Sequence, residues 1–295
     1  MAVLRRIRSK HYRKLEKGWL KELKTRVISG IFIFLILAGV LIPGGYLLAG
    51  VLFAVSFISF YELVRALGIH EEGKNFNALE LCGYASIIVH YVQMILVRDY
   101  RYYIFSLMFA FFLIMVCYVV NFPKFKSMQA IATFFCFVYA PVNMSFVYLL
   151  RIRAFGKYLA WIPFIAWVCD TCAYFTGRAF GKHKLAPLLS PKKTIEGAIG
   201  GIIGSVLVGA LIGYIIYVRE NYKVDVIWVM AIITFAGSII AQLGDLLASG
   251  IKRDHNIKDY GKLIPGHGGI MDRFDSVIFV IPCIYFLAAV LTRRF

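Results

Sequence analysis

Long apolar runs alternate with short polar stretches along most of this chain. Each run is close to the length of about 20 residues that an α-helix needs to cross the hydrocarbon core of a bilayer. The pattern predicts nine such helices, near residues 27–42, 44–64, 77–97, 102–120, 128–150, 158–176, 197–217, 226–246 and 276–292. Only Pro43 and Gly44 separate the first two, so eight is the alternative count. We therefore expect an all-α integral membrane protein, a polytopic helical bundle.

The composition also indicates a membrane protein. Of the 295 residues 60% are hydrophobic, and the mean hydropathy is +0.75, whereas soluble domains are about 45–50% apolar. The six cysteines are scattered through the predicted helices, so we expect no disulfides, and Cys169-x-x-Cys172 is interpreted as helix packing rather than a redox or metal pair. Ten Lys and Arg precede the first apolar run, which argues against a cleavable signal peptide.

Positive charge is unevenly divided between the two sides of the predicted membrane. The net charge is +17, and 24 of the 33 Lys and Arg fall on the side of the N-terminus. By the positive-inside rule the N-terminus is therefore expected in the cytoplasm, with the protein in the inner membrane of the cell. The basic arm 1–26 is expected to rest on anionic lipid headgroups. No nucleic-acid partner is expected, because no soluble module accompanies the charge.

Ionisable residues divide the rest of the chain into two regions. Residues 27–157 are predicted helices with short loops, whereas residues 158–295 contain two long polar loops, 177–196 and 247–274, both expected on the cytoplasmic side. We expect the second region to be catalytic. The few ionisable residues inside the first region are interpreted as packing or helix-end residues, and they are Glu62, Glu80 and His90.

Each long loop follows a helix with an acidic residue near its inner end, where an unpaired charge is costly. These acids are Asp170 and Asp245. On a helix, Asp245, Ser249 and Lys252 form one stripe that runs toward the cytoplasm. Lys252 and Arg253 are explained as long side chains that reach the interface, but Asp245 lies deeper than they do. A carboxylate with a hydroxyl nearby offers the hard oxygen ligands that suit Mg²⁺.

The stretch HGGIMDRFD, residues 267–275, leads into the last predicted helix. Asp272 and Asp275 share a helix face at i and i+3, and Arg273 lies off it. The glycines before them can present backbone N–H groups to an anion. A glycine-rich helix start with one acid would be favourable on its own, but it leaves the second Asp, the Arg and the His unexplained. We therefore interpret this stretch as functional.

The other polar loop contains Ser190-Pro-Lys192-Lys193-Thr194 just before a predicted helix. Two lysines and two hydroxyls at a helix start suit a triphosphate. The upstream Gly-x-x-x-Gly-Lys at 177–182 is one residue short of a P-loop and is followed by His, so a Walker A site is rejected. Small residues every four positions then predict close helix packing, with another helix of this chain or with a second protomer in a homodimer. They are Gly197, Gly201, Ser205, Gly209 and Gly213.

Three stretches over about residues 160–285 match one family pattern. They read Ser249-x-x-Lys252-Arg253-x₄-Lys258-Asp259-x₅-Pro265-Gly266-His267-Gly268-Gly269-x-x-Asp272-Arg273-x-Asp275, Asp170-Thr171-x-Ala173-Tyr174-Phe175-x-Gly177-Arg178-x-Phe180-Gly181-Lys182, and Ser190-Pro191-Lys192-Lys193-Thr194-x-Glu196-Gly197. Together they resemble the phosphatidate cytidylyltransferase (CDP-diacylglycerol synthase) family. Two departures concern peripheral contacts: Ala248 stands where members often have an acid, and Ile195 where they often have Trp.

The resemblance implies transfer of CMP from CTP to phosphatidic acid, with pyrophosphate as the second product. Because two anions must meet, Asp245 and Asp272 are expected to hold Mg²⁺, with a second cation left open. Arg273 is expected at the lipid phosphate, and Asp170 is expected to support a metal ligand or the nucleotide. The expected phosphate-binding residues are Lys192, Lys193, Arg253 and Lys258. The other residues expected at the catalytic centre or the substrates are Lys252, Asp275, Tyr174, Arg178, Ser190, Thr194, Ser249, Asp259, His267, Gly268 and Gly269.

Two other functions remain open from the sequence. A CTP-dependent lipid kinase of the dolichol- or phytol-kinase type would release CDP instead of pyrophosphate. A membrane transporter would also carry charges within its helices. The acids here gather at one membrane face rather than at the midplane, and the full signature of the last polar loop favours the transferase.

Overall fold

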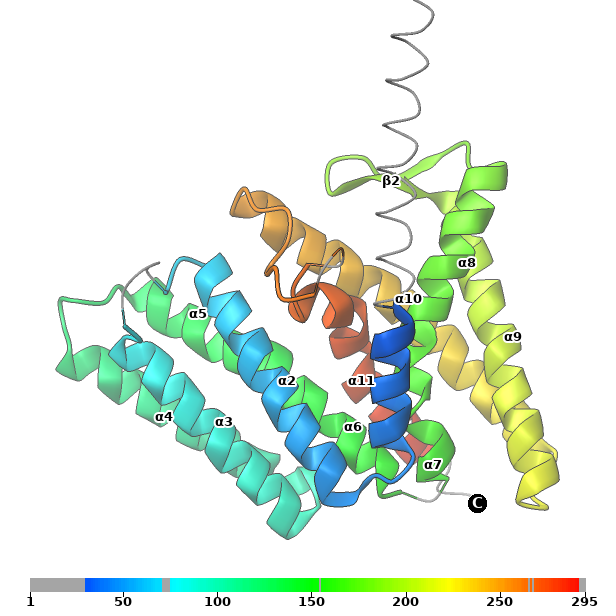
Figure 1. The fold of residues 1–295 in the computed structure, drawn as a ribbon, viewed down its shortest axis with the longest axis horizontal. Helices are drawn as coiled ribbons and strands as arrows, with labels where there is room; N and C mark the ends of the chain where they lie inside the picture. Colours follow the sequence, from blue (N-terminus) through cyan, green and yellow to red (C-terminus); the bar gives the residue numbers. More distant parts are fainter. Residues whose placement is uncertain (1–29, 71–74, 154, 265, 267, 292–295) are drawn as a thin grey trace, which may run out of the picture.

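The computed structural model describes residues 30–70, 75–153, 155–264, 266 and 268–291 (Figure 1). The predicted basic arm 1–26, His267 and residues 293–295 lie outside the described residues. Within them, eight helical segments are long and apolar enough to cross a membrane, and a shorter apolar helix, Gly30–Leu41, comes before them. The all-α polytopic fold class is thereby confirmed.

The eight long segments coincide with the last eight predicted helices to within a few residues, except that α10 continues eight residues past its predicted end. Three of them contain short irregular turns, at η1, η2 and η3. Their bounds are α2 Gly45–Ala66, α3 Ala78–Val97, η1 Tyr100–Tyr102 with α4 Tyr103–Val120, α5 Ser127–Phe137 with η2 Val138–Val142 and α6 Asn143–Arg151, α7 Gly156–Leu159 with η3 Ile162–Phe164 and α8 Ile165–Phe180, α9 Ile195–Arg219, α10 Asp225–Asp254 and α11 Met271–Leu291.

Local signals in the sequence explain several of these bounds. Helix α3 begins with a capping box, in which Asn77 Oδ1 accepts the N–H of Glu80 (3.0 Å) and the Glu80 carboxylate accepts the N–H of Asn77 (3.3 Å). Helix α9 begins after Thr194, whose Oγ1 accepts the N–H of Gly197 (3.1 Å). Pro141 has no N–H to donate, and the helix widens into the π-turn η2 around it.

Helix α11 lies in the middle of the bundle and joins its two halves (Figure 1). It packs against α2 and α6 from the first half and against α8 and α10 from the second. Helices α8, α9 and α10 pack against one another, at the right of the view. The last helix, which carries the Asp-Arg-x-Asp stretch, is therefore in contact with both halves of the chain.

The small-residue ridge of α9 packs inside this chain. A Cβ at Gly201 would lie 2.7 Å from the carbonyl oxygen of Cys169 on α8, and one at Gly213 would lie 2.6 Å from Cα of Ile227 on α10. The ridge therefore lets α8 and α10 approach α9 closely. This favours the first of the two alternatives left open by the sequence. Cys169 and Cys172 belong to the same packing surface, and all six cysteines are free, as predicted.

A two-stranded antiparallel hairpin between α8 and α9 was not predicted. Its strands are β1 Lys184–Ala186 and β2 Ser190–Thr194, with Lys184 opposite Thr194. Such short strands in a polar loop show no alternation of apolar and polar residues, so the sequence offered no periodicity by which to recognise them. The hairpin fixes the position of the two lysines that precede α9.

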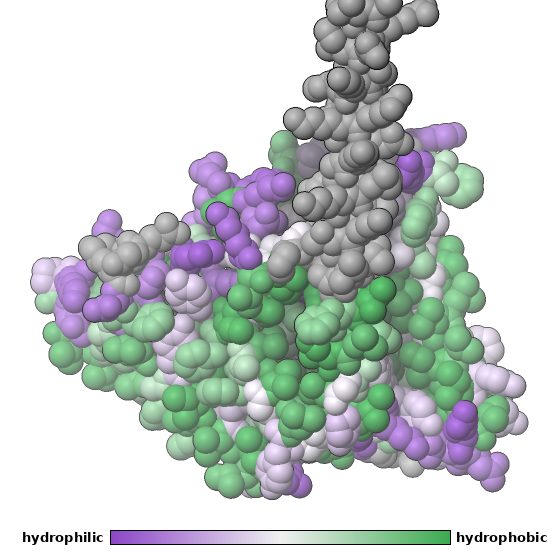
Figure 2. Space-filling model, viewed as in Figure 1, coloured by the Kyte–Doolittle hydropathy of each residue, from purple (hydrophilic) through white to green (hydrophobic). Residues whose placement is uncertain are grey.

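Both long polar loops lie on one face of the bundle, at the top in Figure 1, where α2, α4, α8 and α10 end. We call this side the loop face. In Figure 2 hydrophilic residues gather along the loop face and along the opposite end, and a broad hydrophobic band lies between them. This distribution matches a protein whose middle is surrounded by lipid chains.

Candidate active site

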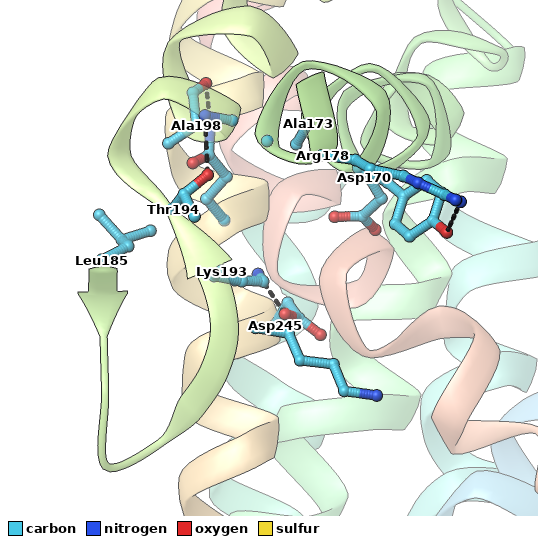
Figure 3. A pocket seen from close by; sticks show the side chains of 13 residues that line it. Asp170, Ala173, Arg178, Leu185, Lys193, Thr194, Ala198 and Asp245 are labelled. Atoms are coloured by element: carbon cyan, nitrogen blue, oxygen red, sulfur yellow. Dashed lines mark hydrogen bonds and ion pairs between the residues drawn. The ribbon is translucent and has the colours of Figure 1, made fainter. Parts of the chain in front are cut away.

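A cavity of about 380 Å³ opens beneath the hairpin, between α8, α9 and α10 (Figure 3). Its charged lining comes from three separate elements: Asp170 and Arg178 on α8, Lys192 and Lys193 on β2, and Asp245 on α10. Tyr174, Thr194 and Gln242 also line it. Two acids and three cations thus share one space, and all five were predicted as site residues from separate stretches of sequence.

Lys193 and Asp245 form an ion pair that connects the hairpin to α10 (Figure 3). Each side chain is 24% exposed, so the pair is largely shielded from solvent. Asp170 lies close enough to interact electrostatically with both partners. The positive charge of Lys193 therefore offsets part of the repulsion between these two carboxylates.

Three glycines surround Thr194 and let α8, the hairpin and α9 meet. A Cβ at Gly177 would lie 2.7 Å from Thr194 Oγ1, one at Gly181 would lie 2.9 Å from the same atom, and one at Gly197 would lie 2.7 Å from the carbonyl oxygen of Ala173. Any larger side chain would push these segments apart. The glycines of both sequence motifs therefore act through packing, around one wall of the cavity.

Glu196 fixes the start of the hairpin. Its carboxylate accepts the backbone N–H groups of Lys182 (3.1 Å) and His183 (3.3 Å), and it contacts Nδ1 of His183 at 2.6 Å. Glu196 lies in the first turn of α9, where a negative charge is favourable to the helix dipole. It thus ties the chain that leaves α8 to the beginning of α9.

A second group of charged residues lies where α10 ends and α11 begins. Lys252 Nζ is 3.1 Å from Oδ1 of Asp272 and 3.7 Å from Oδ2 of Asp275. Both acids are buried, and Asp275 also interacts electrostatically with Asp170 and Asp245. The group therefore adjoins the acids of the cavity beneath the hairpin.

The backbone N–H groups of the last polar loop converge on Asp272. Its Oδ2 atom accepts N–H from Tyr260 (2.7 Å), Gly269 (3.0 Å) and Gly261 (3.4 Å). Gly268, at φ 82°, lets the loop turn back toward this carboxylate. The anion that the glycine-rich loop binds in the structure is thus a carboxylate of the same chain, and Oδ1 is left to face Lys252.

Tyr260 closes this group from the side of α10. Its hydroxyl donates to the carbonyl oxygen of Ala248 (3.0 Å), and its ring lies 5.2 Å from Lys252 Nζ. Burial raises the pKa of the Tyr260 hydroxyl above its ordinary value, so the residue is neutral at physiological pH. It serves as a buried hydrogen-bond donor.

A second cavity, of about 370 Å³, shares Asp170 with the first. It is lined by Gly30 and Ile33 of the first described helix, by Trp167, Asp170 and Thr171 of α8, and by Arg273 of α11. Among the described residues, Nε of Arg273 is buried without a hydrogen-bond partner, whereas its backbone carbonyl accepts from Trp167 Nε1 (3.0 Å). A buried guanidinium N–H without a partner is costly and suits an anionic ligand.

The remaining predicted residues are more peripheral. Ser249 is half-buried on α10, between Asp245 and Lys252, as its place in the helical stripe requires. Ser190 begins β2 and is half-buried. Arg253, Lys258 and Asp259 are exposed at the loop face, so they lie at the edge of the charged group. His267 lies outside the described residues.

Metal binding depends on how closely the acids converge. Among the described residues, no three Asp, Glu, His or Cys side chains lie close enough to hold a metal ion together. Mg²⁺ usually takes only one or two carboxylates and completes its shell with substrate oxygens and water. The donor set of this site, buried carboxylates beside a cluster of cations, fits that mode of binding.

Glu62 is a contributor that sequence reasoning missed. It lies on α2, 4% exposed, and accepts the N–H groups of Ile270 (3.1 Å) and Met271 (2.7 Å) at the start of α11. Its interpretation as a satisfied helix-end residue was right about its hydrogen bonds. Its contact with a loop more than 200 residues away had no local signal in the sequence.

Comparison with known proteins gives a consistent result. The model of the Cytidylyltransferase family matches residues 24–291 of the chain. A protein of Staphylococcus saprophyticus named phosphatidate cytidylyltransferase is 34% identical over 276 residues, which is 90% of this chain and 98% of that protein. Proteins with the same name from Staphylococcus epidermidis and Staphylococcus aureus are 34% and 31% identical over 275 residues, with the same coverage.

Proposed function

The chain belongs to the cytidylyltransferase family and catalyses the phosphatidate cytidylyltransferase reaction, and we propose that it does so at Asp170, where its two charged cavities meet. In this reaction CTP and phosphatidate give CDP-diacylglycerol and pyrophosphate. The lipid kinase and transporter alternatives are not favoured. The observation that carries the proposal is that Asp170 lines both cavities, with Lys193 on one side and Arg273 on the other.

The cavity beneath the hairpin is the proposed CTP site. Lys192 and Lys193 approach it from β2 and Arg178 from α8, which together offer three cations to a triphosphate. Tyr174, whose hydroxyl accepts a hydrogen bond from Arg178 (3.3 Å), lies on the same wall. Lys193 would exchange its contact with Asp245 for a phosphate oxygen when the nucleotide binds.

The cavity on the side of Trp167 is the proposed site of the lipid phosphate. Arg273 supplies the anion-binding group, and the apolar Ile33 and Trp167 beside it suit the glycerol and acyl ends of a lipid. This side is bounded by the first described helix, whose surface is largely exposed and apolar. The headgroup would then enter from the bilayer while CTP enters beneath the hairpin.

The chemical step joins the two substrates. An oxygen of the lipid phosphate attacks the α-phosphorus of CTP and forms a new P–O bond. The bond between the α-phosphorus and the oxygen that bridges it to the β-phosphorus breaks. Pyrophosphate leaves with the electron pair. The attacking phosphate is already an anion at neutral pH, so no side chain has to remove a proton. The task of this chain is to hold two anions in line and to neutralise their repulsion.

Mg²⁺ is the proposed cofactor, with Asp245 and Asp272 as its protein ligands and a second cation left open. Oδ2 of Asp272 already accepts three N–H groups, so Oδ1 is the oxygen that is available to an ion. When bound, such an ion neutralises phosphate charge and polarises the P–O bonds. Lys252, now between Asp272 and Asp275, would be displaced toward phosphate oxygens.

The proposed location is the inner membrane of the cell, with the loop face toward the cytoplasm. The predicted arm 1–26 and both long polar loops carry most of the positive charge, which the positive-inside rule assigns to that side. CTP is a cytoplasmic nucleotide, so a site beneath the hairpin has to open there.

The reaction is tested with purified protein, phosphatidate, Mg²⁺ and CTP labelled at either the α- or the γ-phosphorus. Label from the α position should enter the lipid, and label from the γ position should appear in pyrophosphate. Label entering the lipid from the γ position would indicate a kinase and would contradict the proposal.

A further inference from the structure

Glu62 is a buried acid that connects the first half of the chain to the last polar loop. Its two carboxylate oxygens accept the N–H groups of Ile270 and Met271, and the pairs are separated by more than 200 residues in the sequence. Where a side chain satisfies the first N–H groups of a helix, it commonly comes from the residue just before the helix. Here the acceptor comes from another helix, so the start of α11 is tied to α2.

The loop is shaped to receive this carboxylate. A Cβ at Gly261 would lie 2.7 Å from Cδ of Glu62, and one at Gly269 would lie 2.6 Å from it. Both glycines therefore leave the room that the acid occupies. The same two glycines donate their N–H groups to Asp272. Glu62 and Asp272 thus lie against the same short loop and accept different backbone N–H groups of it.

Arg65 adds a second contact from the same end of α2. Its Nη2 atom donates to the carbonyl oxygen of Tyr260 at 2.6 Å. The N–H of Tyr260 donates to Asp272 at 2.7 Å. One turn of α2 therefore contacts the loop on both sides of Asp272. Arg65 binds Tyr260, which donates to Asp272, and Glu62 binds the residues directly after Gly269, which also donates to Asp272.

We propose that Glu62 and Arg65 form a clamp that positions Asp272 and Lys252 for nucleotidyl transfer. The inference rests on the proposed function, because it assigns both residues to positioning rather than to contact with a substrate. The clamp makes the orientation of Asp272 depend on the packing of α2 against α11. The N-terminal half of the chain thereby contributes to a reaction whose proposed charged residues all come from the C-terminal half.

Glu62→Gln is the principal test, because Gln keeps the shape of the side chain but can accept only one of the two N–H groups. We expect kcat to fall between about tenfold and a hundredfold, the range of a misplaced reacting group. The KM values for CTP and phosphatidate should stay close to those of the wild type. Hydrogen–deuterium exchange in peptides covering residues 259–272 should become faster.

Glu80→Gln is the matched control. Glu80 is also a fully buried acid at the loop face, but it caps α3 and contacts His70 (2.9 Å) instead of the last polar loop. It should lower the melting temperature without changing kcat per folded molecule. Arg65→Met is the second variant. It removes the contact with Tyr260 and should lower kcat in the same direction as Glu62→Gln.

Three results would overturn the clamp: unchanged kcat in Glu62→Gln, unchanged exchange at 259–272, or an equal loss of kcat in Glu80→Gln. If Glu62→Gln does not fold, unchanged kcat in Arg65→Met would overturn it as well. A wild-type protein that forms no CDP-diacylglycerol would contradict the proposed function alone. The exchange measurements would still decide whether Glu62 holds the loop.

Discussion

Lys252 Nζ lies between two buried acids, 3.1 Å from Oδ1 of Asp272 and 3.7 Å from Oδ2 of Asp275. The lysine comes from the end of α10, and both acids come from the first turns of α11, so this contact joins the two helices at the loop face. Two carboxylates at this depth would repel each other without a cation between them. Lys252 thus contributes to the stability of the site as well as having a proposed role in its chemistry.

Replacing Lys252 by Met should destabilise the protein by about 3–5 kcal/mol, because removal of one partner leaves buried charges uncompensated. The loss is measured by thermal denaturation in detergent. Adding Asp275→Asn to Lys252→Met should recover part of it, since one of the repelling charges is removed. A double variant that is less stable than Lys252→Met alone would show that the charge of Asp275 is not a significant source of this destabilisation.

The two proposed metal ligands should differ in their effect on folding. Asp245→Asn and Asp272→Asn should each reduce kcat by at least about a hundredfold, as expected for a lost charge-stabilising group. Asp272→Asn should also lower the melting temperature, because Asp272 accepts three backbone N–H groups, whereas Asp245→Asn should lower it less. Mg²⁺ titrations of initial rate provide the second measurement. Near-normal turnover with the wild-type Mg²⁺ dependence in either variant would refute its role as a ligand.

The glycine ridge should be intolerant of larger side chains for reasons of packing. Gly201→Val would insert a branched side chain against the backbone of α8. It should lower the free energy of unfolding by at least about 1–3 kcal/mol. Ile203→Val on the exposed side of α9, where Ile203 is 55% exposed, is the control and should be nearly neutral. Equal melting temperatures for the two variants would mean that α8 and α9 are not packed as described.

The orientation of the protein can be tested at the tip of the hairpin. Leu188 is 92% exposed there, so Leu188→Cys in a cysteine-free background should react readily with a thiol reagent. In intact cells a membrane-impermeant reagent should label it only after the membrane is opened. Labelling from outside intact cells would place the loop face, and the proposed CTP site with it, outside the cell and would contradict the predicted orientation.

The helices and the main charged residues could be predicted from the sequence because both depend on local patterns. Apolar runs of membrane-spanning length fix the helices, and an acid such as Asp245 is conspicuous against an apolar background. The hairpin that carries Lys193 was missed because its strands are short and lack alternation. Glu62 was missed for a different reason: its partners are backbone N–H groups at the start of α11, and no side-chain pattern in the sequence indicates a contact of that kind.

The motifs also did not show how the loop glycines are used. Gly268 and Gly269 were expected to bind a ligand anion through their N–H groups. In the structure Gly269 donates to Asp272, a carboxylate only three residues further along the chain. Spacing alone does not distinguish a loop that binds a substrate from one that orients its own acid, because both need the same conformation. In this chain the two cases are distinguished by tertiary contacts: the loop donates backbone N–H groups to Asp272 and to Glu62 of α2.

The central claim is that CTP and the lipid phosphate occupy separate cavities that meet at Asp170. Steady-state kinetics of Lys193→Ala and Arg273→Ala, with CTP and phosphatidate each varied, test it most directly. Lys193→Ala should raise the KM for CTP at least about tenfold and leave that for phosphatidate nearly unchanged, as expected for the loss of a charged hydrogen bond. Arg273→Ala should show the opposite pattern. The same KM affected in both variants, or the two patterns exchanged, would contradict the assignment of the cavities.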